Sequence, residues 1–267
     1  MGQLSEDAKT DALHFALRVA DAADSIILFH AGNVRSEMKP DGTPVSDVDR
    51  AIERMVHAAV KRDRRDEEVL GEENVTGYRP DGSRIWVVDP IDGTELLVNG
   101  DPGYVFSMAL VIDGHPEVAV VRDPRTGRSW YATLGGGAWL NGTTRLRVSD
   151  HTQIIRQAGW EPARPAGNMF LWPDVVSLVD GAGVTPLEYG SVIRSAMDVA
   201  MGRLDGLMFG RSGPWDMATA ALIVPEAGGR FTDLLGFNQR VDQPVNGGLL
   251  SNLWIHEDLV QLVEYQR

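Results

Sequence analysis

Hydrophobic residues form two different patterns along this chain. In the first third they recur at helical spacing, which predicts one helix ending at Gly32 and a second beginning after Ser46. Short apolar runs separated by turn dipeptides follow, and this pattern is typical of strands joined by hairpins. The predicted strands are Trp86–Asp89, Tyr104–Ile112, Glu117–Arg122, Trp130–Thr133 and Ala138–Leu140.

The second half alternates helical and strand patterns. Helices are predicted over Val192–Met201, Met217–Ala227 and Glu257–Tyr265, with strands at Leu207–Phe209 and Leu249–Ser251. The Pro- and Gly-containing stretch Arg156–Asp174 indicates a boundary or a long loop. Hairpins combined with helices predict a layered α+β fold. We expect one domain over residues 1–267, with an α+β half of about 1–150 and an α/β half of about 151–267.

Composition excludes several classes of function. The 267 residues are 43% hydrophobic and 24% charged, which is ordinary globular composition. A formal net charge of -13 argues against binding a nucleic acid polymer, which needs a basic surface. The absence of cysteine excludes disulfides, zinc thiolate sites and cysteine nucleophiles. No apolar run reaches the ~18 residues of a membrane span, so we expect a cytoplasmic protein with no membrane partner.

Two carboxylates stand at the end of the first predicted strand. Asp89 follows the apolar residues Val87 and Val88, Pro90 is expected to end the pairing, and Asp92 begins a turn. Acids this close to a buried strand need a cation to neutralise them. Carboxylate oxygens are the ligands that Mg²⁺ prefers, so the motif indicates a hard divalent metal.

Other acids join this pattern. Glu72 and Glu73 follow a short apolar run, and Asp216 precedes a predicted helix. Together with Gly93 and Thr94, whose N–H groups would face a phosphate if they open a helix, the acids suggest metal-assisted phosphoryl transfer to water.

Taken singly, the same residues have ordinary explanations. Asp216 can be a helix N-cap, Asp92 with Gly93 a turn, and the two glutamates surface charge. Ser46 and Asp49 have the spacing of a capping box, and Asp49 also has the alternative of orienting a hydroxyl near the acids.

Four motifs in series carry a family resemblance. They are Lys39 to Asp49, Gly71-Glu72-Glu73, Asp89-Pro90-Ile91-Asp92-Gly93-Thr94, and Trp215-Asp216 with Glu226-Ala227-Gly228-Gly229. In this order they resemble the signatures of the inositol monophosphatase superfamily. The resemblance implies an αβαβα layered fold and Mg²⁺-dependent, lithium-sensitive hydrolysis of a small-molecule phosphate monoester, often by a homodimer.

The resemblance also implies a role for each matching residue. Two or three Mg²⁺ ions would be bound by the set Glu72, Asp89, Asp92 and Asp216 and by the Ile91 carbonyl, with Glu73 assisting. Thr94 and Asp49 would position the attacking water, which makes them catalytic together with Glu72. The amides of Gly93 and Thr94 would hold the phosphate, and Asp216 would also lie against the substrate.

Three positions depart from the family pattern. Glu95 stands where the inositol branch continues with Asn, Arg194 where a small Gly often precedes Ser/Thr-Ala, and Phe209 where a substrate-binding Glu is typical. Arg194 is either a salt-bridge partner or a ligand for a second anionic group. Phe209 is either a core residue or a face on which a base stacks.

Because of these departures, the resemblance does not identify one substrate. The front half resembles histidinol-phosphate phosphatases, whereas Phe209-Gly210 resembles the 3′-nucleotidase branch. The alternatives are therefore an inositol-type monoester, histidinol phosphate, or a nucleoside or sugar phosphate of a specialised pathway. A non-catalytic metal or metabolite sensor is the rival from another class. The presence of every expected ligand speaks against that rival.

Overall fold

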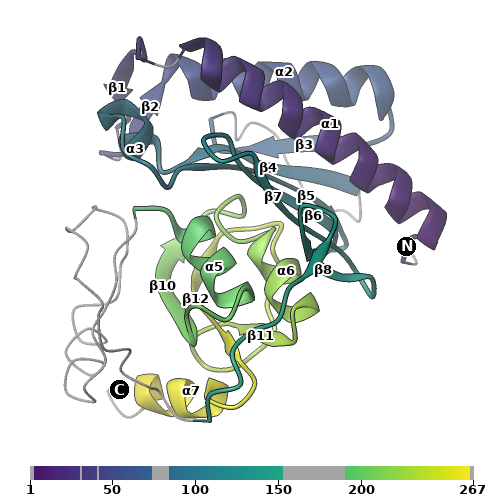
Figure 1. Cartoon of the computed structure of the whole chain (residues 1–267), viewed down its shortest axis with the longest axis vertical. Helices are drawn as coiled ribbons and strands as arrows, with labels where there is room; N and C mark the ends of the chain where they lie inside the picture. The colour runs from purple at the N-terminus through teal and green to yellow at the C-terminus, as the bar shows by residue number, and fades with distance from the viewer. Residues whose placement is uncertain (1–2, 31, 41, 74–83, 153–189, 265–267) are drawn as a thin grey trace.

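The helices and sheets form five layers, which Figure 1 shows edge on. Helices α1 and α2 cover one face of a seven-stranded sheet, α5 and α6 cover the other, a three-stranded sheet follows, and α7 lies outside it. The predicted layered α+β architecture is confirmed. The helices are α1 (Glu6–His30), α2 (Asp47–Asp63), α3 (Thr94–Asn99), α5 (Val192–Ala200), α6 (Ala220–Glu226) and α7 (His256–Glu264).

The computed structural model describes residues 3–30, 32–40, 42–73, 84–152 and 190–264. The predicted boundary at Arg156–Asp174 lies outside these residues. Within the described ranges, no helix has the length and apolar character needed to cross a membrane.

The large sheet runs in the order β3-β4-β5-β6-β7-β8-β9 and is antiparallel except for the parallel pair β3 and β4. Its strands are β3 (Glu68–Gly71), β4 (Arg84–Asp92), β5 (Val105–Ile112), β6 (His115–Asp123), β7 (Arg128–Thr133), β8 (Gly137–Leu140) and β9 (Thr144–Arg145). Asp113 and Gly114 join β5 to β6 with φ angles of 53° and 83°. Two consecutive positive φ values suit the twist of a tight hairpin, which confirms the predicted turn.

Two small sheets complete the fold. β10 (Gly206–Ser212), β12 (Val245–Asn252) and β11 (Gly229–Thr232) pair antiparallel in that order. β1 (Ser36–Met38) and β2 (Pro44–Ser46) form a hairpin just before α2. Gly228, with φ 89°, ends α6 and leads into β11, as expected for a glycine after a helix.

Strand β4 separates two hydrophobic cores. Trp86 and Val88 pack towards α1 and α2, whereas Ile85 and Val87 belong to the core shared with α5 and α6. Successive side chains of a strand point to opposite faces, so Asp89 follows Val87 towards α5 and α6. The alternation therefore directs the first carboxylate of the motif into the space between the large sheet and the second half of the chain.

Two predicted boundaries were wrong. Pro90 does not end the strand, because β4 continues to Asp92 through a register shift between the pairs Asp89–Ser107 and Asp92–Val105. A bulge leaves one residue unpaired, so it tolerates a proline that has no N–H to donate. Helix α6 begins at Ala220 rather than at Met217, which leaves Asp216 in the turn before it.

Candidate active site

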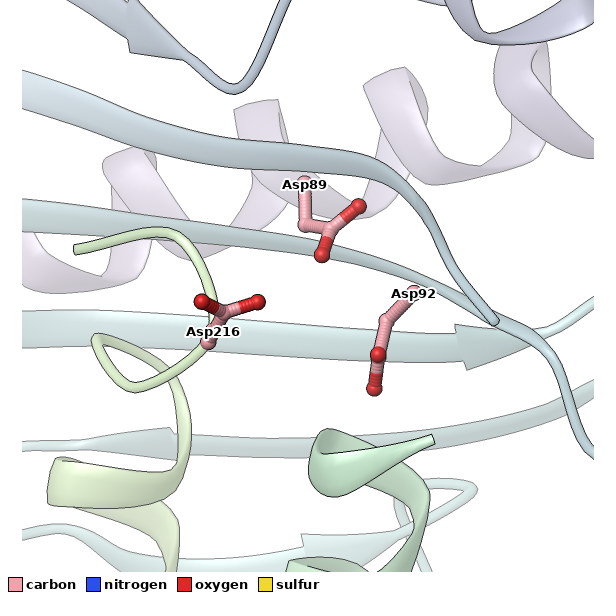
Figure 2. Close-up of side chains that lie close together, drawn as sticks. All are labelled: Asp89, Asp92 and Asp216. Carbon is pink, nitrogen blue, oxygen red and sulfur yellow. The ribbon is translucent and has the colours of Figure 1, made fainter. Parts of the chain in front are cut away.

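Three aspartates converge between the large sheet and α6. Asp89 and Asp92 come from β4 on either side of the bulge, and Asp216 comes from the turn before α6. One carboxylate oxygen from each lies within 4.8 Å of the others, and Figure 2 shows the three side chains facing a common space. Asp89 is 1% exposed and Asp92 is 8% exposed. The bulge therefore brings two acids of one strand to the same buried place.

Each aspartate is held by a hydrogen bond from the backbone. Asp89 Oδ1 accepts from the Ile91 amide at 3.0 Å, and Asp216 Oδ2 accepts from the Gly213 amide at 2.7 Å. Asp92 Oδ2 accepts from the Ser191 hydroxyl at 2.5 Å and from the Ile193 amide at 2.7 Å. These hydrogen bonds fix the orientation of the three carboxylates.

Asp216 is not a helix N-cap, which was one interpretation of its position. Thr219 is the N-cap of α6, and the Asp216 carboxylate closes a turn with Gly213 instead. The Asp92 carboxylate accepts hydrogen bonds at the start of α5, so it is more than a turn residue.

Glu72 and Glu73 are not simple surface charges either. Lys39 Nζ lies 2.7 Å from Glu72 Oε1 and 2.8 Å from Glu73 Oε1, and all three side chains are largely buried. Glu72 also interacts electrostatically with Asp89 and Asp216, so its charge adds to that of the aspartate cluster. Lys39 is therefore the cation paired with the glutamates, whereas nothing comparable pairs with the aspartates among the described residues.

Burial raises the pKa of Glu72 and of the three aspartates. Desolvation is the main cause and neighbouring carboxylates add to it for Glu72 and Asp216, whose pKa values rise to about 8 and about 7. Desolvation likewise raises the pKa of Asp92 to about 6 and that of Asp89 well above its usual range. The hydroxyl of Ser107, which is paired with Asp89 across the strands, is buried with no hydrogen-bond partner among the described residues. Oxygen donors that are buried, crowded and short of positive charge fit a hard divalent cation.

These shifts predict how stability depends on pH without metal. The folded-state pKa values lie above those of the unfolded chain, so the folded state binds more protons and its stability falls as pH rises from about 4 to about 8. We expect the melting temperature in EDTA to decrease between about pH 5.5 and pH 8, and excess Mg²⁺ to remove most of that slope. Differential scanning fluorimetry at matched ionic strength measures both. A metal-free melting temperature that is flat or rising over this range would contradict the prediction.

A hydroxyl and a carboxylate lie next to the bulge. Thr94 Oγ1 lies 3.2 Å from Asp49 Oδ1 and 3.1 Å from the Ile91 carbonyl oxygen. Asp49 Oδ2 accepts from the Ser46 amide at 2.8 Å and from the Ser46 hydroxyl at 2.5 Å. Both alternatives for Asp49 are therefore correct, because one oxygen completes the capping box of α2 and the other faces Thr94. Burial raises the pKa of Asp49 to about 6.

Helix α3 begins directly at this pair. Gly93 is its N-cap with φ 95°, and no side chain within the described residues caps its first N–H groups. A Cβ at position 93 would lie 3.2 Å from the Gly190 carbonyl oxygen, so glycine suits both the φ angle and the close approach. The first N–H groups of α3 remain available to an anion.

The side chains of two predicted substrate contacts have partners outside the carboxylate cluster. Arg194 Nη1 lies 3.0 Å from Asp198 Oδ2, and its guanidinium carbon lies 5.3 Å from the centre of the Trp130 ring. Phe209 is 2% exposed and stacks on Phe231. The structure favours an ion-pair role for Arg194 and a core role for Phe209. For each residue this role is one of the two alternatives that the sequence left open.

Sequence reasoning missed Ser191. It is the N-cap of α5 and donates its hydroxyl to Asp92, while Gly190 precedes it with φ 70°. The family pattern often has a glycine at the position of Arg194, before a hydroxyl residue. In this chain a glycine and a hydroxyl residue lie about one turn earlier, at the start of the helix. The available signal was Gly190-Ser191 immediately before the apolar residues Val192 and Ile193, a common helix start.

Comparisons with known proteins identify the family of this chain. The model of the inositol monophosphatase family matches residues 9–266. The "Fructose-1,6-bisphosphatase/inositol-1-monophosphatase" of Thermotoga maritima is 31% identical over 265 residues, 95% of this chain and 96% of its own. A "Histidinol-phosphatase" of Mycobacterium tuberculosis is 38% identical over 239 residues, 85% and 88% of the two chains. The solved Thermotoga maritima IMPase superposes with a TM-score of 0.78 at 28% identity, covering 96% of this chain and 97% of that one. The chain belongs to the inositol monophosphatase family of phosphoric monoester hydrolases.

Proposed function

We propose that this protein hydrolyses a small phosphate monoester with Mg²⁺ bound by its acidic cluster. The observation that carries the proposal is the convergence of three aspartates, two buried and one partly buried, beside the Thr94–Asp49 pair. The bulge of β4 and the residues just after it therefore combine three features. These are a cation site, a hydroxyl paired with a carboxylate, and the uncapped start of α3. Phosphoryl transfer needs this combination, because it depends on positioning and on charge stabilisation.

The ligands are the residues that the family resemblance assigns. Asp89, Asp92, Asp216 and Glu72 would supply carboxylate oxygens for two or three ions, and Ile91 would supply its carbonyl. Bound Mg²⁺ would supply the Lewis acidity that polarises the phosphoryl group and acidifies water. Hydrogen bonds from backbone amides orient Asp89, Asp92 and Asp216 as ligands. The ion pair with Lys39 orients Glu72.

Thr94 and Asp49 would position and deprotonate the attacking water. The Thr94 hydroxyl accepts a hydrogen bond from water while it donates its own proton towards Asp49 Oδ1, 3.2 Å away. Asp49 suits the acceptor role because burial raises its pKa to about 6, close to neutral pH. Ser46 holds Asp49 in place through its amide and its hydroxyl. The Gly93 and Thr94 amides would bind the phosphate at the start of α3.

Histidinol phosphate is the second candidate substrate beside an inositol-type phosphate. It is favoured by the 38% identity to the Mycobacterium tuberculosis histidinol-phosphatase. A nucleoside phosphate has less support, because the buried Phe209 ring cannot stack on a base.

Phosphate release from a substrate panel tests the proposal. The panel is inositol 1-phosphate, histidinol phosphate, fructose 1,6-bisphosphate and adenosine 3′,5′-bisphosphate, each assayed with Mg²⁺ and with EDTA. We expect one of the first two compounds to reach a kcat/KM of about 10⁴ M⁻¹s⁻¹ or more, only with Mg²⁺. Absence of Mg²⁺-dependent release from every compound would contradict the proposal and favour a sensor. Lithium inhibition and a homodimer in light scattering are further expectations of the same proposal.

A further inference from the structure

Helix α2 carries a second buried carboxylate that the proposed chemistry does not use. Glu53 lies four residues after Asp49, so the two side chains occupy the same face of the helix, and the Glu53 side chain is 4% exposed. Burying a carboxylate costs free energy unless it is hydrogen-bonded or paired. Its contacts therefore indicate what the residue does.

Glu53 contacts the backbone on both sides of Glu72. Its Oε2 accepts a hydrogen bond from the Glu73 amide at 2.9 Å. Its two carboxylate oxygens fill the space next to Gly71, where an added Cβ would lie 2.5 Å and 2.8 Å from them. His57 Nε2 lies 3.7 Å from Glu53 Oε1 and has no hydrogen-bond partner among the described residues.

We propose that Glu53 is a positioning residue for Glu72. It accepts a hydrogen bond from the Glu73 amide and packs against Gly71, and thereby aims the intervening Glu72 carboxylate at the aspartates. This inference rests on the proposed function, in which Glu72 is a metal ligand. This contact also requires Gly71, because only a residue without Cβ lets the Glu53 carboxylate approach the end of β3 so closely.

The comparison of two substitutions separates positioning from simple packing. Glu53→Ala removes the acceptor of the Glu73 amide, whereas Glu53→Gln keeps an acceptor and the size of the side chain. The readout is Mn²⁺ affinity without substrate, measured from the electron paramagnetic resonance signal of free Mn²⁺. Partners behind a metal ligand typically change affinity by 10–100-fold, so we expect about that loss for Glu53→Ala and about threefold or less for Glu53→Gln.

Val60→Ala is the matched control. Val60 is buried on α2 almost two turns beyond Glu53, in the core between α1, α2 and the sheet. We expect this substitution to lower the melting temperature and to leave Mn²⁺ affinity unchanged. Equal affinities for Glu53→Ala, Val60→Ala and the native protein would overturn the positioning role.

Gly71→Ala gives an independent test that retains Glu53 itself. The φ angle at Gly71 is not positive, so alanine is compatible with the backbone, and the atoms nearest to the added methyl are those at the end of the Glu53 side chain. We expect a loss of Mn²⁺ affinity similar to that of Glu53→Ala. The double variant should bind no more weakly than Glu53→Ala alone, because both changes remove the same contact. Additive losses would overturn the inference.

The outcomes also distinguish this inference from the function on which it rests. A native protein that binds no Mn²⁺ at the cluster contradicts the proposed function. Normal binding by the native protein and by both Glu53→Ala and Gly71→Ala contradicts only the positioning role. If Glu53→Ala does not fold, the contrast between Gly71→Ala and Glu53→Gln decides the question.

Discussion

Asp89→Asn is expected to lower kcat/KM for the best substrate by about 10³-fold or more, because it removes a charged ligand from the cation site. Asparagine keeps the Oδ1 acceptor of the Ile91 amide, so the bulge should remain folded. The metal-free protein should become more stable, because one of several mutually repelling buried carboxylates is gone. The rise in melting temperature on adding Mg²⁺ should shrink. Steady-state kinetics and scanning fluorimetry with and without Mg²⁺ measure these effects.

Asp205→Asn is the control for this prediction. Asp205 hydrogen-bonds Ser149 and His151 rather than the carboxylate cluster, so the same change of acid to amide should leave turnover and the Mg²⁺ effect close to native. Activity of Asp89→Asn within tenfold of native would rule out the assigned role of Asp89.

Thr94→Val is expected to lower kcat by about 10²–10³-fold while leaving Mn²⁺ affinity and KM nearly native. Valine has the shape of threonine but has no hydroxyl to relay a proton to Asp49. Thr94→Ser restores the hydroxyl and should recover most of the rate. A valine variant as fast as the serine variant would refute the role of the hydroxyl. Mn²⁺ titration of the same proteins checks that the metal site is intact.

Together the two substitutions separate binding of the cation from activation of water. Asp89→Asn should lose metal affinity and turnover together, whereas Thr94→Val should lose turnover alone. An equal loss of Mn²⁺ affinity in both variants would indicate that Thr94 acts mainly on the fold around Ile91. Its hydroxyl would then act through the hydrogen bond to the Ile91 carbonyl oxygen.

The sequence determined the identity of the acidic residues and most of the elements that carry them. Helical spacing predicted α1, α2 and α5, and short apolar runs between turn dipeptides predicted the strands β4 to β8, because apolar side chains must be buried. The Asp-Gly and Asn-Gly turns were predictable for a local reason, since those residues tolerate positive φ angles. The capping box at Ser46 was also predictable locally, because its two side chains, Ser46 and Asp49, are three residues apart in the sequence.

Tertiary structure alone decided which side chains meet. Pro90 was expected to end β4, but pairing with β5 resumes at Asp92, and the resulting bulge brings Asp89 and Asp92 to one place. Arg194 and Phe209 departed from a family pattern, and only the structure shows that their side chains contact Asp198, Trp130 and Phe231. The contact of Glu53 with Gly71 and Glu73 joins segments 18 and 20 residues apart. Periodicity reports which face of an element is buried, but not which residue of another element lies opposite it, because that depends on the packing of the whole chain.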